Sequence, residues 1–131
     1  MKNVSMKINS NALALLKNKM KSNNKIILLA LNDGSNKYSK LGGTCTIGAD
    51  FQFVILDKKD PEYNIPIENN AGLKIFTAKP EMVFLEDNLV ISARNATLSL
   101  SDNSGLIDGA VSVNYEAATI TKKDFANSGN C

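Results

Sequence analysis

Two short apolar segments constrain this chain most. The first is Lys25–Leu31, KIILLAL, which is apolar from its second residue on and has turn-forming residues on both sides. A run this short and rich in isoleucine is typical of a strand that is buried on both faces. The second is Phe51–Leu56, FQFVIL, a strand pattern whose two faces are both largely apolar. These segments predict strands at the centre of a mostly β fold.

The other periodic segments predict short elements around these strands. A first strand is expected at Met6–Ile8, followed by an amphipathic helix from Asn11 to Lys21. Pro66 favours an edge strand, because proline cannot donate to a sheet ladder. The remaining elements are a hairpin around the turn 69–72, one or two helical turns over 79–85 with Pro80 near the start, a second hairpin around Arg94-Asn95, a turn at 102–105 and a last strand over 110–115.

Size and composition indicate one folded domain. The chain has 131 residues, of which 44% are hydrophobic and 21% are charged. These values are typical of a soluble globule with a single core. The predicted elements, which are mostly short strands, indicate an α+β, mostly β fold. We expect residues 1–116 to form the core domain and residues 117–131 to form a loosely ordered C-terminal tail. The charged run 57–61 is interpreted as a solvated turn.

The charge balance argues against nucleic acid as a partner. Fifteen basic and thirteen acidic residues leave a net charge of +2. Lys17, Lys19, Lys21 and Lys25 gather around the end of the predicted helix, where the helix dipole favours a solvated flank over a phosphate site. The longest apolar run, Ile26–Leu31, is too short to span a bilayer, and no signal-peptide pattern is present. We therefore expect a cytoplasmic protein with no membrane contact.

Histidine is absent from the sequence. Neither Ser-His-Asp nor Cys-His catalysis can be built without it, and the usual general base near neutral pH is missing. A zinc site with histidine ligands is excluded as well. Because no other pairing of nucleophile and base is visible, we expect that the protein is not an enzyme.

One of the two cysteines, Cys45, lies in the segment 41–50, LGGTCTIGAD. A thiol between a loop rich in glycine and threonine and the strand Phe51–Leu56 suits a ligand for a soft metal. It suits a small buried side chain equally well. The residues alone leave both interpretations open. The second cysteine, Cys131, follows Gly129-Asn130 in the predicted tail.

The order of these elements resembles the HesB-like, A-type iron–sulfur cluster biosynthesis family over about residues 5–115. The segment 72–92, GLKIFTAKPEMVFLEDNLVIS, is similar to that family's pattern of glycine, strand, short helix ending in leucine, aspartate and strand. The resemblance implies a twisted β-sandwich with one N-terminal helix packed on it and a short second helix. Family carriers use three cysteines, one after the central loop and two in a Cys-Gly-Cys motif. Cys45 falls in the first place, whereas the Cys-Gly-Cys motif is missing.

The resemblance also implies a function. The protein is expected to bind iron or an iron–sulfur cluster through the thiolates of Cys45 and Cys131, and to exchange it with apoprotein recipients or cluster assembly proteins. Clusters generally take about four ligands, so a homodimer would bring four thiols together. The alternative is a degenerate module of the same fold that has lost metal binding and contacts protein partners.

Overall fold

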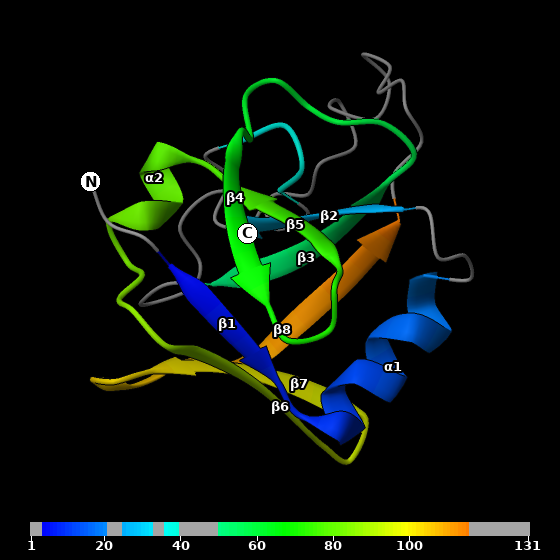
Figure 1. The fold of residues 1–131 in the computed structure, drawn as a ribbon, viewed down its shortest axis with the longest axis vertical. Coiled ribbons are helices and arrows are strands. Elements are labelled where there is room, and N and C mark those ends of the chain that lie inside the picture. Colours follow the sequence, from blue (N-terminus) through cyan, green and yellow to red (C-terminus); the bar gives the residue numbers. More distant parts are fainter. Residues whose placement is uncertain (1–3, 21–24, 33–35, 40–49, 116–131) are drawn as a thin grey trace.

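The computed structural model describes residues 4–20, 25–32, 36–39 and 50–115. Within these ranges, eight strands and two helices follow one another along the chain (Figure 1). Their bounds are β1 Ser5–Ile8, α1 Ser10–Met20, β2 Ile26–Leu31, β3 Phe51–Leu56, β4 Ile65–Asn69, β5 Lys74–Thr77, α2 Lys79–Met82, β6 Leu89–Arg94, β7 Thr97–Asp102 and β8 Gly105–Tyr115.

The strands form a closed barrel in the order β1-β4-β5-β2-β3-β8-β7-β6. Strand β1 closes it, because β1 pairs in parallel with β4 on one side and with β6 on the other. The mostly β fold with an N-terminal helix and a short second helix is confirmed. The twisted sandwich is not confirmed, because the strand pairing runs continuously round the barrel.

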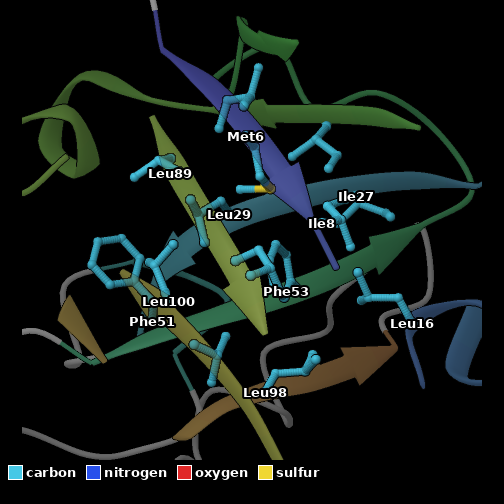
Figure 2. Packing of buried hydrophobic residues seen from close by; sticks show 14 of the residues in the cluster. Met6, Ile8, Leu16, Ile27, Leu29, Phe51, Phe53, Leu89, Leu98 and Leu100 are labelled. Carbon is cyan, nitrogen blue, oxygen red and sulfur yellow. The ribbon is translucent and has the colours of Figure 1, made fainter. Parts of the chain in front are cut away.

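Strands β2 and β3 pair in an antiparallel manner along their full length, and every residue in both is buried. Alternate residues point to opposite faces of the sheet. One set, which includes Ile27, Leu29 and Phe53, packs in the main core inside the barrel (Figure 2). The opposite set packs outside it in a second cluster with Tyr38, Tyr63 and Ala78. The prediction that both faces of Lys25–Leu31 are buried is therefore confirmed, with loop residues as the outer cover.

Helix α1 packs on β6 and β8, at the end of the barrel away from α2 (Figure 1). Its buried residues Ala12, Leu16 and Met20 recur every four positions, as expected for one apolar stripe. The helix begins one residue before the predicted start, and the predicted end at Lys21 lies outside the described residues. Of the two helices described, neither is long and apolar enough to cross a membrane.

Helix α2 begins after Ala78 and has Pro80 in its first turn, where a missing N–H costs no helical hydrogen bond. Glu81 in that turn is only 2% exposed. Its Oε2 accepts a hydrogen bond of 2.9 Å from the backbone N–H of Leu31, which joins α2 to the end of β2. The sequence predicted this helix and placed Glu81 in the first turn, but it did not predict that the carboxylate is buried.

Two predictions about strands are corrected. The last strand begins at Gly105, before the predicted Ala110, because its pairing with β7 extends to the turn at Asp102. The edge strand suggested by Pro66 is wrong, because β4 has neighbours on both sides in the closed barrel. Among the described residues, β1 pairs with β4 only at Glu68 and Asn69. Pro66 therefore lies outside that ladder, where it needs no N–H.

Candidate functional site

The predicted ligands Cys45 and Cys131 both lie outside the described residues. The structure therefore neither brings the two thiols together nor separates them. It does describe the two places where the segment 40–49 meets the barrel. We call residues 36–39 the first anchor and residues 50–51 the second anchor. The candidate site is the end of the barrel that holds these anchors, where β2 ends and β3 begins.

The first anchor is held by a compact set of hydrogen bonds. Asn36 donates its side-chain N–H to the carbonyl of Leu31 at 2.8 Å and accepts from the backbone N–H of Tyr38 at 2.9 Å. Tyr38 is only 5% exposed, and its ring lies 5.6 Å from that of Tyr63. The chain that leads to residue 40 is thus fixed to the outer cluster beside β2.

Gln52 joins the first anchor to the barrel. Its side-chain nitrogen donates to the carbonyls of Tyr38 at 2.9 Å and Leu31 at 3.3 Å. Its side-chain oxygen accepts from the amide of Asn114 at 2.7 Å. Gln52 is fully buried, and these bonds satisfy the polar atoms of its amide that burial takes from water.

Both residues of the second anchor, Asp50 and Phe51, form hydrogen bonds through their backbones. The carbonyl of Asp50 accepts from the backbone N–H of Asn32 at 2.7 Å, which extends the pairing of β2 and β3 by one step. The backbone N–H of Phe51 donates to Oδ2 of Asp108 at 2.7 Å. Residues 40–49 therefore join the barrel between two points that are fixed by buried hydrogen bonds.

A charged group lies next to the first anchor. Oδ2 of Asp60 is 2.7 Å from the ammonium of Lys37 and accepts the hydroxyl of Tyr38 at 2.5 Å. Burial alone would raise the pKa of Asp60, but the hydrogen bonds from Lys37 and Tyr38 outweigh burial, so that pKa is lowered. Burial, reinforced by the bond to Asp60, raises the pKa of Tyr38. Asp60 therefore stays a carboxylate at neutral pH and orients both partners.

Apolar side chains are exposed at the same end of the molecule. Val83 and Phe84 follow α2 and are 78% and 44% exposed. The ring of Phe84 meets that of Phe51 edge to face, with centroids 6.3 Å apart and an interplanar angle of 82°. These two residues thus form an apolar surface next to the second anchor.

The described residues contain no group of three or more Cys, His, Asp or Glu side chains that could hold a metal ion. The carboxylates near the anchors have structural partners: Asp60 binds Lys37 and Tyr38, and Asp108 binds Phe51.

Three polar residues that bond to or lie within the anchors were not singled out from the sequence as site residues: Gln52, Asp60 and Asp108. The solvated turn expected for the run 57–61 is right for 57–59 and 61, which are exposed, and wrong for Asp60, which is 7% exposed. The one available signal was Gln52, a polar residue inside an otherwise apolar strand. Such a residue needs hydrogen-bond partners once it is buried.

Comparisons with known proteins agree on one family. The model of a family described as iron-sulphur cluster biosynthesis matches residues 4–115. No curated protein matches the sequence at a significant level.

Solved structures of similar fold include two from lactobacilli. A "putative Fe-S biosynthesis protein" from Lactobacillus acidophilus is 33% identical, with a TM-score of 0.73 over 86% of this chain and 90% of that chain. A second structure, a "putative Fe-S biosynthesis protein" from Lactobacillus salivarius "with novel protein fold", is 24% identical. Its TM-score is 0.70 over 87% of this chain and 99% of that chain. At that identity, the second likeness shows the fold alone.

Proposed function

The chain belongs to the iron–sulphur cluster biosynthesis family, and from this premise we propose that it is an A-type, carrier-like protein that binds iron or an iron–sulfur cluster through the thiolate of Cys45. One observation carries the proposal. Cys45 lies within the matched residues 4–115, in the segment between the two anchors, whereas Cys131 lies beyond them.

The anchors support a role for this segment as a ligand-bearing loop. The described residues on either side of it are bonded to buried side chains, Tyr38 to Gln52 and Phe51 to Asp108. A segment whose flanking residues are held in place has less conformational entropy to lose when it binds a ligand than a segment with free flanks. The cargo would be exchanged by ligand substitution, in which a recipient's thiolate takes the place of Cys45 on the iron without a change of oxidation state.

The number of thiols favours a second copy of the chain. A cluster generally needs about four ligands, and the sequence has two cysteines. The described residues contribute no cluster of acidic ligands that would make up the difference. We propose that a homodimer supplies four thiols, Cys45 and Cys131 from each copy. We also propose that apoprotein recipients or cluster assembly proteins are the further partners.

Anaerobic reconstitution with iron and sulfide tests this function. We expect the wild type to gain visible absorption and bound iron, the Cys45→Ser variant to lose both, and Cys131→Ser to lose part. Thr46→Ser is the matched control, since it changes a neighbouring residue without removing a thiol. Iron retained by Cys45→Ser at the level of the wild type would contradict the proposal.

A second candidate is a protein-interaction module without metal. It is favoured by the exposed surface of Val83 and Phe84 beside the second anchor, and by the lack of a metal-ligand group among the described side chains. The same reconstitution separates the two functions. Wild-type protein that binds no iron under these conditions would favour the module.

The remaining parts of the proposal follow from the sequence. We propose that the role is non-catalytic and that the protein acts in the cytoplasm. We also propose that residues 1–116 form the working domain, with 117–131 as a tail that carries Cys131.

A further inference from the structure

A groove of about 490 Å³ lies between α1 and the turn that joins β6 to β7. The helix contributes one face to it, which includes Asn11, Leu15 and Asn18. These positions follow the spacing of one helical stripe. The turn contributes the opposite wall through Arg94, Asn95 and Ala96. The lining thus combines asparagine residues, small or aliphatic residues and one arginine.

This groove lies at the end of the barrel opposite the second anchor. Phe51 begins β3, whereas Arg94 ends β6. Strand β8 is parallel to β3 and antiparallel to β7, and β7 is antiparallel to β6, so β3 and β6 run in the same direction. Figure 1 shows α1 next to the end of β6 and α2 on the other side of the molecule. The groove is therefore separate from the second anchor.

The charged residue that lines the groove, Arg94, and the two charged residues of the adjacent helix α1 are all positive. Lys17 and Lys19 are the neighbours of Asn18 in sequence, so they leave the helix about 100° to either side of it. Arg94 stands on the opposite wall, and all three side chains are exposed. Helix α1 and strand β6 contain no acidic residue. None of the ion pairs among the described residues involves these three cations.

The helix dipole explains only part of this pattern. Lys17 and Lys19 lie in the last turn of α1, where positive charge stabilises a helix. Arg94 is on a strand and has no such reason to face the same groove. Its planar guanidinium is suited to a carboxylate, which it can bind through two parallel hydrogen bonds.

We infer that the groove binds an acidic, extended segment of a partner protein. Arg94 would take one carboxylate, and Lys17 and Lys19 would attract others. The amides of Asn11, Asn18 and Asn95 can both donate to and accept from a peptide backbone. Leu15 and Ala96 offer apolar contact for a side chain between the acidic positions. The inference goes beyond the proposed metal binding and does not depend on it.

A protein segment suits this groove better than a nucleic acid does. Single-stranded nucleic acids are held by aromatic side chains on which bases stack, together with a strongly basic surface. The lining contains no aromatic residue, and the net charge of the chain is only +2. Charge complementarity and the peptide-like amides therefore favour an acidic polypeptide.

Binding of a short fluorescein-labelled peptide, in which Glu and Asp alternate with Ala and Leu, tests the inference on the full chain at physiological salt. We expect the amide NMR signals that shift on titration to be those of α1 and the β6–β7 turn. The triple variant Lys17→Gln, Lys19→Gln, Arg94→Gln should bind about tenfold more weakly or worse. Ala14→Glu, which puts a negative charge on an exposed groove position, should also lose binding.

The matched control is the triple variant Lys58→Gln, Lys74→Gln, Lys79→Gln, which removes three exposed cations outside the groove. Its net charge equals that of the groove variant. It should bind the peptide as the wild type does. Equal losses in the two triple variants would overturn the inference, because binding would then follow net charge alone. Tighter binding of a single-stranded oligonucleotide at the same signals would also overturn it. Cys45→Ser should bind the peptide normally, so a failed metal site does not affect this test.

Discussion

Phe51 donates its backbone N–H to Oδ2 of Asp108 at 2.7 Å, so the first residue of β3 is tied to a residue 57 positions further along the chain. The other carboxylate oxygen, Oδ1, accepts the N–H of Ala110 at 2.9 Å. Asp108 lies where the pairing of β7 with β8 shifts its register. Its side chain thus supplies acceptors at a point where the regular ladder is interrupted.

Asp108→Ala should lower the free energy of unfolding by about 2–3 kcal/mol, because it leaves two N–H groups without their acceptor and one of them is buried. Urea denaturation of the iron-free protein measures this. Asp102→Ala is the matched control, since Asp102 accepts one exposed bond from Ser104. It should cost about 0.5 kcal/mol or less. Equal losses in the two variants would contradict the role given to Asp108.

Ala96→Gly should stabilise the protein. Residues 95 and 96 form the two-residue turn of the β6–β7 hairpin, and their φ angles are 52° and 64°. Asparagine followed by glycine is the preferred pair for such a turn, and alanine at a positive φ is strained. We expect a gain of about 0.5–1 kcal/mol in the free energy of unfolding, seen as a higher melting temperature.

Asn95→Gly is the control for this turn, because asparagine already tolerates a positive φ. It should leave the melting temperature nearly unchanged. A loss of stability in Ala96→Gly would mean that the methyl group in the groove lining contributes more than the backbone strain costs.

Asp60→Asn should destabilise the protein at neutral pH by roughly 1–3 kcal/mol, since it removes a buried carboxylate from Lys37 and Tyr38. The pKa of Asp60 is lowered from its ordinary value of 3.8 by folding. A group whose pKa is lower in the folded protein than in the unfolded chain contributes stability at pH values above its unfolded pKa. That contribution is lost as the pH falls through its folded pKa. The difference between wild type and variant should therefore be constant above about pH 5 and shrink below about pH 4.

Urea midpoints measured across this pH range check the prediction for Asp60. Glu62→Gln is the control, because Glu62 lies 3.7 Å from the same Lys37 but its side chain is 72% exposed. Its effect should be small, as is usual for surface ion pairs. A difference that does not change with pH would show that the charge of Asp60 contributes nothing.

The sequence predicts the elements of this fold well, because its strands and α1 are marked by local patterns. The two-faced burial of Lys25–Leu31 follows from an unbroken apolar run, and the start of α2 follows from Pro80. Closure of the barrel could not be predicted, since it depends on β1 pairing with two strands that are distant in sequence. Pro66 wrongly suggested an edge strand for the same reason, because β4 gains its second neighbour only through the pairing with β1.

The candidate site was predicted less completely. Cys45 was found by residue type and remains a prediction, because it lies outside the described residues. The carboxylates of Asp60 and Asp108 were missed because their partners lie 22 and 57 residues away. Long-range pairs of this kind leave no periodic signal in a single sequence.

Gln52 and Asn114 provide the last prediction. The side-chain oxygen of Gln52 accepts the amide of Asn114 at 2.7 Å, and its nitrogen holds the carbonyl of Tyr38 at the first anchor. Gln52→Met keeps the length of the side chain but removes its amide. The side chain of Asn114 and the carbonyl of Tyr38 then each lose their hydrogen bond to residue 52. We expect it to lower the free energy of unfolding by about 2–3 kcal/mol, because a buried carbonyl loses its donor.

A double-mutant cycle with Asn114→Ala separates the parts of this effect. Asn114→Ala alone should cost less, since Asn114 is only partly buried and Gln52 keeps its two carbonyls. The coupling between the two sites should be about 0.5–1.5 kcal/mol, as expected for residues in one hydrogen-bond network. Additive losses would mean that the Gln52–Asn114 bond contributes nothing. Gln52 would then stabilise the barrel only through Tyr38 and Leu31, at the anchor that leads to Cys45.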